Sequence, residues 1–77
     1  MKSIYADKYQ QIGLKIAYCR KLRGLTQEQL AERLELSPAF IGHVEAPNIN
    51  KAVSLDTLFD VAAALNVPPY KFLLFDE

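Results

Sequence analysis

The side chains that could carry out catalysis are few in this sequence of 77 residues. His43 and Glu45 have the His-x-Glu spacing found in zinc-dependent hydrolytic sites, but the paired cysteines that would complete such a site are absent. The single cysteine, Cys19, falls on an otherwise apolar stripe and is expected to lie in the core. The sequence also lacks a glycine-rich phosphate loop and any carboxylate pair that stands out from the surface charge. These observations argue against an enzyme and predict neither a metal nor a cofactor.

The composition is that of one globular domain. Hydrophobic residues make up 51% of the chain and charged residues 23%, which is the balance of a folded protein. We expect a single domain over residues 1–77, with its core between about residues 8 and 75. No apolar run approaches the roughly 20 residues that a membrane span needs, and the amino terminus has no hydrophobic stretch long enough for a secretory signal. The sequence therefore favours a cytoplasmic protein with no membrane partner.

The charges cancel over the whole chain, with nine basic and nine acidic residues. Their distribution is uneven, because only Asp7 is acidic before Gly24 while most of the cations lie there. The cations before Gly24 are Lys2, Lys8, Lys15, Arg20, Lys21 and Arg23. The asymmetry permits a basic face of the kind that nucleic-acid binding uses, although Lys15, Lys21 and Arg23 are expected to be ordinary solvated charges.

Start and stop signals predict two helices in the first half of the chain. Asp7 is expected to cap the first helix through a capping box, and Gly24 is expected to end it. Thr26 and Gln29 form a second capping box, which opens a helix over residues 27–34. The apolar residues expected to face the core on these helices are Tyr9, Ile12, Ile16, Cys19, Leu30, Ala31 and Leu34.

Three further helices are predicted in the second half. Ser37 and Pro38 suit the cap and the first position of a third helix. Ser54 caps a fourth helix over residues 55–65, and a short fifth helix is expected over residues 70–74. The apolar residues expected to face the core are Ile41, Val44, Leu55, Leu58, Phe59, Ala62 and Leu65. No run alternates for long enough to be a strand, so the predicted fold class is all-α.

Residues 25–34 read LTQEQLAERL, and residues 36–45 read LSPAFIGHVE. This pair of segments resembles the helix-turn-helix of the lambda-repressor-like family of phage and bacterial regulators. Flanking residues are similar to the other helices of that family; they are Ile12, Gly13, Ile16, Arg20, Ser54, Leu55, Asp56, Thr57, Leu58, Ala62, Leu65 and Val67. The resemblance implies a compact bundle of five helices, with the helix-turn-helix formed by the second and third. It also implies a transcriptional regulator that binds double-stranded DNA as a homodimer on a palindromic site, with the third helix in the major groove.

The resemblance assigns roles to individual positions. Gln27 corresponds to a residue that contacts phosphate and braces the third helix. Arg20 and Glu45 correspond to a pair that forms a structural salt bridge. Phe40 corresponds to an aromatic position near the DNA, and core packing and DNA contact remain equally open for it. The positions that the resemblance places at the DNA are Gln27, Ser37, Pro38, Ala39, Phe40, Gly42, His43, Asn48, Asn50 and Lys51.

Two departures from the family pattern affect these expectations. Glu35 occupies a turn position where glycine is usual, and a positive φ there would cost a non-glycine residue roughly 1 kcal/mol. The groove-facing positions are poor in donors, because Pro38, Ala39 and Gly42 cannot make bidentate contacts to bases. Among the groove-facing positions, His43 is the one with a polar side chain that could bind a base. We therefore expect modest sequence discrimination by each monomer.

The carboxy-terminal segment is more apolar than a small exposed tail should be. We expect part of it to close the core and the remainder to form a homodimer contact or a partner site. The residues predicted for that contact are Tyr70, Phe72, Leu74 and Phe75. An alternative function follows from this surface and from the donor-poor third helix. The chain would then be a protein-interaction module on the same fold, antitoxin-like or anti-repressor-like, with weak or no DNA binding.

Overall fold

The computed structural model describes residues 4–47 and 52–75. Its elements are α1 (Ala6–Leu22), α2 (Gln27–Leu34), α3 (Pro38–Glu45), α4 (Leu55–Leu65) and a short 3₁₀ helix, η1 (Pro69–Leu73). No strand occurs within these two stretches. The predicted all-α class is therefore confirmed, with the difference that the last of the five helices is a 3₁₀ turn.

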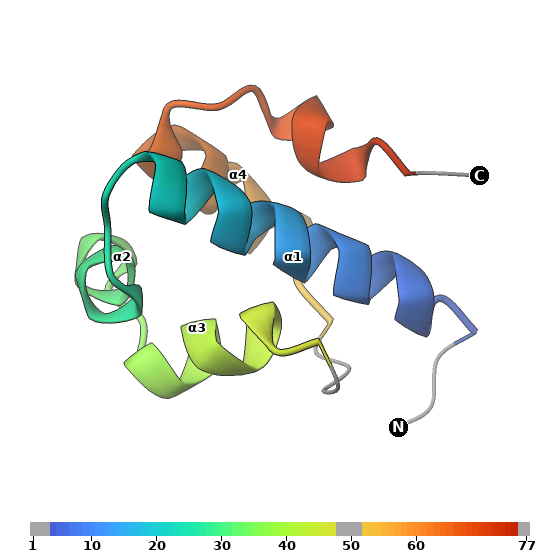
Figure 1. The fold of residues 1–77 in the computed structure, drawn as a ribbon, viewed down its shortest axis with the longest axis horizontal. Helices are drawn as coiled ribbons and strands as arrows, with labels where there is room; N and C mark the ends of the chain where they lie inside the picture. The colour runs from blue at the N-terminus through green and yellow to red at the C-terminus, as the bar shows by residue number, and fades with distance from the viewer. Residues whose placement is uncertain (1–3, 48–51, 76–77) are drawn as a thin grey trace.

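The long helix α1 is the centre of the arrangement. Figure 1 shows α3 on one side of α1, η1 on the opposite side and α4 behind it. The helix α2 is seen nearly along its own axis in this view, whereas α3 runs across the view, so the two helices are steeply inclined to each other (Figure 1). The molecule measures 31 × 24 × 20 Å along its principal axes. No helix in the described part of the chain is long and apolar enough to cross a membrane.

Three helix starts follow the side-chain caps expected from the sequence. The Oγ1 atom of Thr26 accepts from the backbone N–H of Gln29 at 3.0 Å, and the Gln29 side chain accepts from the Thr26 N–H at 2.8 Å. Ser37 and Ser54 each accept from the backbone N–H three residues further on, at 3.1 Å in both cases. These bonds satisfy amides that have no partner within the helix, so the predicted starts of α2, α3 and α4 are confirmed.

The predicted cap of α1 is wrong. The helix begins at Ala6, and Tyr5 occupies the cap position without a side-chain cap bond. Asp7 lies inside the first turn, where its carboxylate still faces the positive end of the helix dipole. The capping-box spacing at Asp7 is therefore accidental, because a Ser, Thr, Asp or Asn forms such a box only when it lies just outside the helix.

Helix ends at three places use a residue in the left-handed conformation. The φ angles are +71° at Gly24 and +56° at both Glu35 and Asn66. At the end of α2, the N–H of Leu36 donates to the carbonyl of Ala31 at 2.9 Å. This is the six-residue backbone bond of a Schellman motif, which satisfies a terminal carbonyl and turns the chain back. The stop expected at Gly24 is confirmed.

The core is formed by one face of each helix together with one aromatic ring from η1. Its buried hydrophobic members are Ile12, Ile16, Leu30, Ala31, Ile41, Val44, Leu58, Val61, Ala62, Leu65 and Phe72. Cys19, placed in the core by its sequence stripe, is half-buried and packs against this cluster.

The expected core face of α4 needs correction at three positions. Leu55 and Phe59 are 60% and 49% exposed, whereas Val61, which was not anticipated, is 2% exposed. The buried positions lie at intervals of three and four from Leu58 to Leu65, so Phe59 falls on the flank of this face. Leu55 lies in the first turn and lines a surface hollow of about 350 Å³. Helical spacing therefore identified Leu58, Ala62 and Leu65 correctly, but it included Leu55 and Phe59 and missed Val61.

Candidate nucleic-acid interface

The helix α3 is held against the core by one face and leaves the opposite face uncovered. Ile41 and Val44 point into the core, where they are 2% and 5% exposed. Pro38, Ala39 and His43 are exposed. An eight-residue helix of this kind can enter a major groove, which is about 12 Å wide and admits one helix.

The turn before α3 sets its direction. Glu35 adopts the left-handed conformation, with φ 56° and ψ 38°, and Leu36 packs against the core. Ser37 then caps α3 and Pro38 takes a first-turn position, where a missing N–H costs nothing. The sequence signals of the turn and the cap thus act together to present the outer face of α3.

Phe40 and Gly42 lie at the border between the two faces of α3. Phe40 is partly buried and packs against the core cluster. Gly42 is also partly buried, and a Cβ atom built there would meet only the Oε1 atom of Gln27, at 3.5 Å. The structure thus gives Phe40 a packing role, and the face that is open to a groove is narrower than the set of positions expected at the DNA.

A buried ion pair ties α1 to the end of α3. The Nε atom of Arg20 donates to Glu45 Oε2 at 2.7 Å, and its Nη2 atom donates to Oε1 at 2.8 Å. The remaining Nη1 atom donates to the backbone carbonyl of Leu25 at 2.6 Å. The structure thus brings together the two residues that the resemblance paired. This bidentate geometry is the strong form of a charge-assisted hydrogen bond.

The ion pair also changes the acid–base behaviour of its cation. The hydrogen bond to the Glu45 carboxylate raises the pKa of Arg20, although burial of the guanidinium opposes the change. A raised pKa means that this contribution to stability is complete below the ordinary arginine pKa and is lost only in strongly alkaline solution. We therefore expect no loss of the Arg20 contribution around neutral pH.

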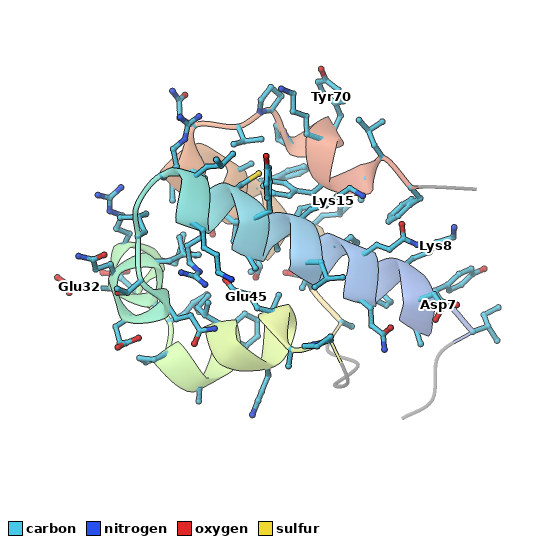
Figure 2. All side chains as sticks on the ribbon, in the orientation of Figure 1. Asp7, Lys8, Lys15, Glu32, Glu45 and Tyr70 are labelled. Atoms are coloured by element: carbon cyan, nitrogen blue, oxygen red, sulfur yellow. The ribbon has the colours of Figure 1, made fainter. Side chains whose placement is uncertain are left out.

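Gln27 braces α2 against the same carboxylate. Its Nε2 atom donates to Glu45 Oε1 at 3.0 Å. Figure 2 shows Glu45 between α1 and α3. Its carboxylate accepts hydrogen bonds from Arg20 of α1 and Gln27 of α2. Each buried side-chain nitrogen or oxygen in the described part of the chain has a hydrogen-bond partner. The first turn of α2, where the resemblance expects a phosphate contact, is thus fixed relative to α3.

Three of the cations that precede Gly24 have partners away from α3. The Nζ atoms of Lys8 and Lys15 lie 4.8 and 5.7 Å from the centre of the Phe75 ring, and Figure 2 shows Lys15 between α1 and the carboxy-terminal segment. Arg23, expected to be an ordinary solvated charge, donates to the carbonyl of Leu65 at 2.7 Å and to that of Asn66 at 3.1 Å. Some of the cations that precede Gly24 therefore pack against an aromatic ring or bind carbonyls at a helix end.

Two residues have roles in this geometry that the sequence analysis did not predict for them. Gly13 lies where α1 crosses α3, and a Cβ atom there would come within 1.9 Å of the Val44 carbonyl oxygen. Arg23 satisfies carbonyls at the end of α4. A glycine inside a helix is unfavourable by itself, so its presence is a signal of close packing. The role of Arg23 has no comparable signal, because it depends on the position of a distant helix.

In the carboxy-terminal segment, the division of residues between core and surface differs from the one predicted. Phe72 is completely buried and cannot form a dimer contact, because its ring fills the core between α1 and α4. Phe75 is partly buried and packs against the core. Tyr70 and Leu74 are 60% and 57% exposed and stay available for a contact. Asn48, Asn50 and Lys51 lie outside the described residues.

Within the described residues, no group of histidine, cysteine, aspartate and glutamate side chains has the arrangement of a metal site. His43 and Glu45 diverge, because His43 is exposed whereas Glu45 is buried against Arg20. The two residues that have the spacing of a hydrolytic motif therefore do not form a common site.

The fold and the exposed α3 face define a helix-turn-helix domain, and comparisons with known proteins agree with this. The sequence profile of the helix-turn-helix family matches residues 16–72. The immunity repressor protein of Bacillus phage phi105 is 43% identical over 56 residues, which are 73% of this chain and 38% of that protein. The match thus covers well under half the length of that relative.

A solved structure supports the same grouping. The restriction-modification controller protein C.AhdI from Aeromonas hydrophila has a TM-score of 0.81 and 27% sequence identity to this chain. The match covers 91% of this chain and 99% of the controller protein. The chain belongs to the helix-turn-helix family, and the resemblance to lambda-repressor-like regulators is confirmed.

Proposed function

We propose that this chain binds double-stranded DNA as a transcriptional regulator, with α3 in the major groove. The observation that carries the proposal is the uncovered face of α3, which a left-handed turn and a capped start hold outward. The relatives named as an immunity repressor and a restriction-modification controller support it. The proposal assigns Gln27 to a backbone phosphate and His43 to the groove, and it gives no residue a catalytic role.

The proposal includes a homodimer on a palindromic site. Two α3 helices separated by one turn of DNA, about 34–36 Å, would double the contacts of a domain that has few base-reading side chains. Tyr70 in η1 and Leu74 directly after it supply exposed apolar surface for the contact between copies. A dimer would also explain how modest discrimination by each monomer becomes useful specificity.

The first experiment is selection from a pool of random-sequence duplex DNA, repeated at two salt concentrations. We expect a palindrome to be enriched, and we expect retention to fall steeply as salt rises, because phosphate contacts release counterions. The double variant Gln27→Ala with His43→Ala should abolish the enrichment, since it removes a phosphate contact and the polar groove-facing side chain.

Lys71→Gln is the matched control for this selection. Lys71 is an exposed residue of η1, which lies across α1 from α3 (Figure 1). Removing its charge should leave the enriched sequence unchanged. A folded parent protein that enriches no sequence, and that is retained equally at both salt concentrations, would contradict the proposed function.

A protein-interaction module is the second candidate, and the outer face of α1 favours it. Leu14, Tyr18 and Leu22 recur at intervals of four residues, and all three are exposed. Such a stripe is typical of a helix face that packs on another protein. Apolar contacts do not weaken with salt as phosphate contacts do, so salt-insensitive binding to a protein with no DNA selection would favour this function.

A further inference from the structure

The side chain of Gln27 is held by a carboxylate that is itself held from another helix. Glu45 Oε1 accepts from Gln27 Nε2 at 3.0 Å and from Arg20 Nη2 at 2.8 Å, while Glu45 Oε2 accepts from Arg20 Nε at 2.7 Å. Arg20 and Glu45 are both buried. Because the guanidinium engages both oxygens, the carboxylate cannot turn to follow the Gln27 amide, and the amide must adapt to the carboxylate.

This arrangement decides which way round the Gln27 amide lies. An ionised carboxylate only accepts hydrogen bonds, so the NH2 group must face Glu45 and Oε1 must point elsewhere. The Oε1 atom lies beside Gly42, 3.5 Å from the position that a Cβ atom would take there. The NH2 group keeps a second N–H, which makes no hydrogen bond to the described residues. Gln27 therefore has one donor left, in a fixed orientation.

We propose that Glu45 is a positioning residue for DNA binding, because it orients the Gln27 amide so that this second N–H is available to a phosphate oxygen. The inference rests on the proposed function and deepens it. A reversed amide would present Oε1 instead, and a phosphate diester offers acceptors only. The Arg20–Glu45 pair thus has a role in recognition in addition to joining α1 and α3.

The central variant is Arg20→Met with Glu45→Met. Exchanging a buried ion pair for apolar side chains of similar length often preserves folding, and the net charge stays the same because one cation and one anion are removed. We expect this variant to fold and to bind a mixed-sequence duplex about 3- to 10-fold more weakly than the parent, the range of one hydrogen bond. The loss should equal that of Gln27→Ala.

Glu45→Gln is the matched variant, and for it we expect DNA affinity to be kept. Its amide oxygen can still accept from Gln27 and Arg20 Nη2, while its NH2 group opposes Arg20 Nε. We expect a lower melting temperature but DNA affinity close to that of the parent. If the ion pair were only structural, DNA affinity would follow stability across the two variants.

A double-mutant cycle completes the test, with Gln27→Ala introduced into the parent and into the Arg20→Met, Glu45→Met variant. The expected loss is about 3- to 10-fold in the parent and none in the variant, because Glu45 acts through Gln27. Equal losses in both backgrounds, or parent-like affinity of the double-Met variant, would overturn the inference. A parent that shows no salt-dependent DNA binding would overturn the proposed function instead.

If circular dichroism shows the double-Met variant to be unfolded, the Gln27 side-chain NH2 signals in NMR spectra decide the matter. We expect the proton that faces Glu45 to exchange with solvent more slowly than the other NH2 proton, in the parent and in Glu45→Gln. Equally rapid solvent exchange of both protons in the parent would show that Glu45 does not hold the amide, and the inference would fail.

Discussion

Glu35 shows how a single residue can carry strain without changing the fold. It adopts φ +56° at the end of α2, as Asn66 does at the end of α4. Asparagine tolerates the left-handed region better than most residues do, whereas a glutamate side chain gains nothing from it. The turn nevertheless forms, because Leu36 packs against the core and its N–H bonds to the carbonyl of Ala31.

Relieving that strain should stabilise the protein. We expect Glu35→Gly to raise the free energy of unfolding by about 0.5–1 kcal/mol, because glycine adopts a positive φ without a steric cost. The melting temperature should rise by about 3–6 °C. Glu35→Ala is the control, since it removes the carboxylate but keeps the strain. A gain of the same size in Glu35→Ala would show that charge, and not backbone conformation, is responsible.

At the scale of elements, the approach of α1 to α3 depends on a residue without a side chain. A Cβ atom at Gly13 would lie 1.9 Å from the Val44 carbonyl oxygen, which is backbone and cannot rotate away. Arg20 and Glu45 join the same two helices further along α1. The position of α3 relative to α1 is therefore fixed by two contacts along α1, the close backbone approach at Gly13 and the ion pair at Arg20.

Gly13→Ala should separate these helices. We expect a loss of about 2–3 kcal/mol in the free energy of unfolding, even though alanine is the better helix former by up to about 1 kcal/mol. Gly42→Ala is the matched control, because its Cβ atom would meet only Gln27 Oε1 at an ordinary 3.5 Å. Chemical denaturation of both variants measures the difference. Equal effects of the two alanines would contradict the close approach of α1 and α3.

At the scale of the whole molecule, exposed apolar side chains occur in several regions, and two of these regions bear on self-association. One is the carboxy-terminal segment with Tyr70 and Leu74, and the other is the outer face of α1 with Leu14 and Tyr18. Phe72, between the exposed residues of the first region, is buried and anchors this segment to the core. The carboxy-terminal segment is therefore held in place on the domain. Its exposed side chains thus form a preformed surface for self-association.

The homodimer can be tested by exchanging residues in either region. We expect Tyr70→Ser with Leu74→Ser to weaken self-association at least about tenfold in sedimentation equilibrium, because each residue would bury apolar surface in the dimer. Leu14→Ser with Tyr18→Ser is the control, since these side chains are similarly exposed, at 50% and 65%. A parent that is monomeric at every concentration, or dissociation caused only by the α1 variants, would contradict the placement of the dimer contact.

Much of the fold could be predicted because its determinants are local. Thr26, Ser37 and Ser54 cap helices through bonds to amides three residues away, and Gly24 ends α1 by its own conformational freedom. Bonds of this range depend only on neighbouring residues, so the types and spacing of those residues identify them. The resemblance to a known family supplied the pairing of Arg20 with Glu45, which no local signal contains.

Residue types and spacing were enough to identify the helical segments, the starts of three of them, and the helix-turn-helix made by the second and third. Three features emerged only from the packed helices: Phe72 fills the core, Arg23 reaches the carbonyl of Leu65 across 42 positions, and the NH2 edge of the Gln27 amide faces Glu45. The difference lies in the range of the interactions. Caps and helical stripes are set within a few residues, whereas these later contacts exist only once the helices have packed at a particular distance and angle.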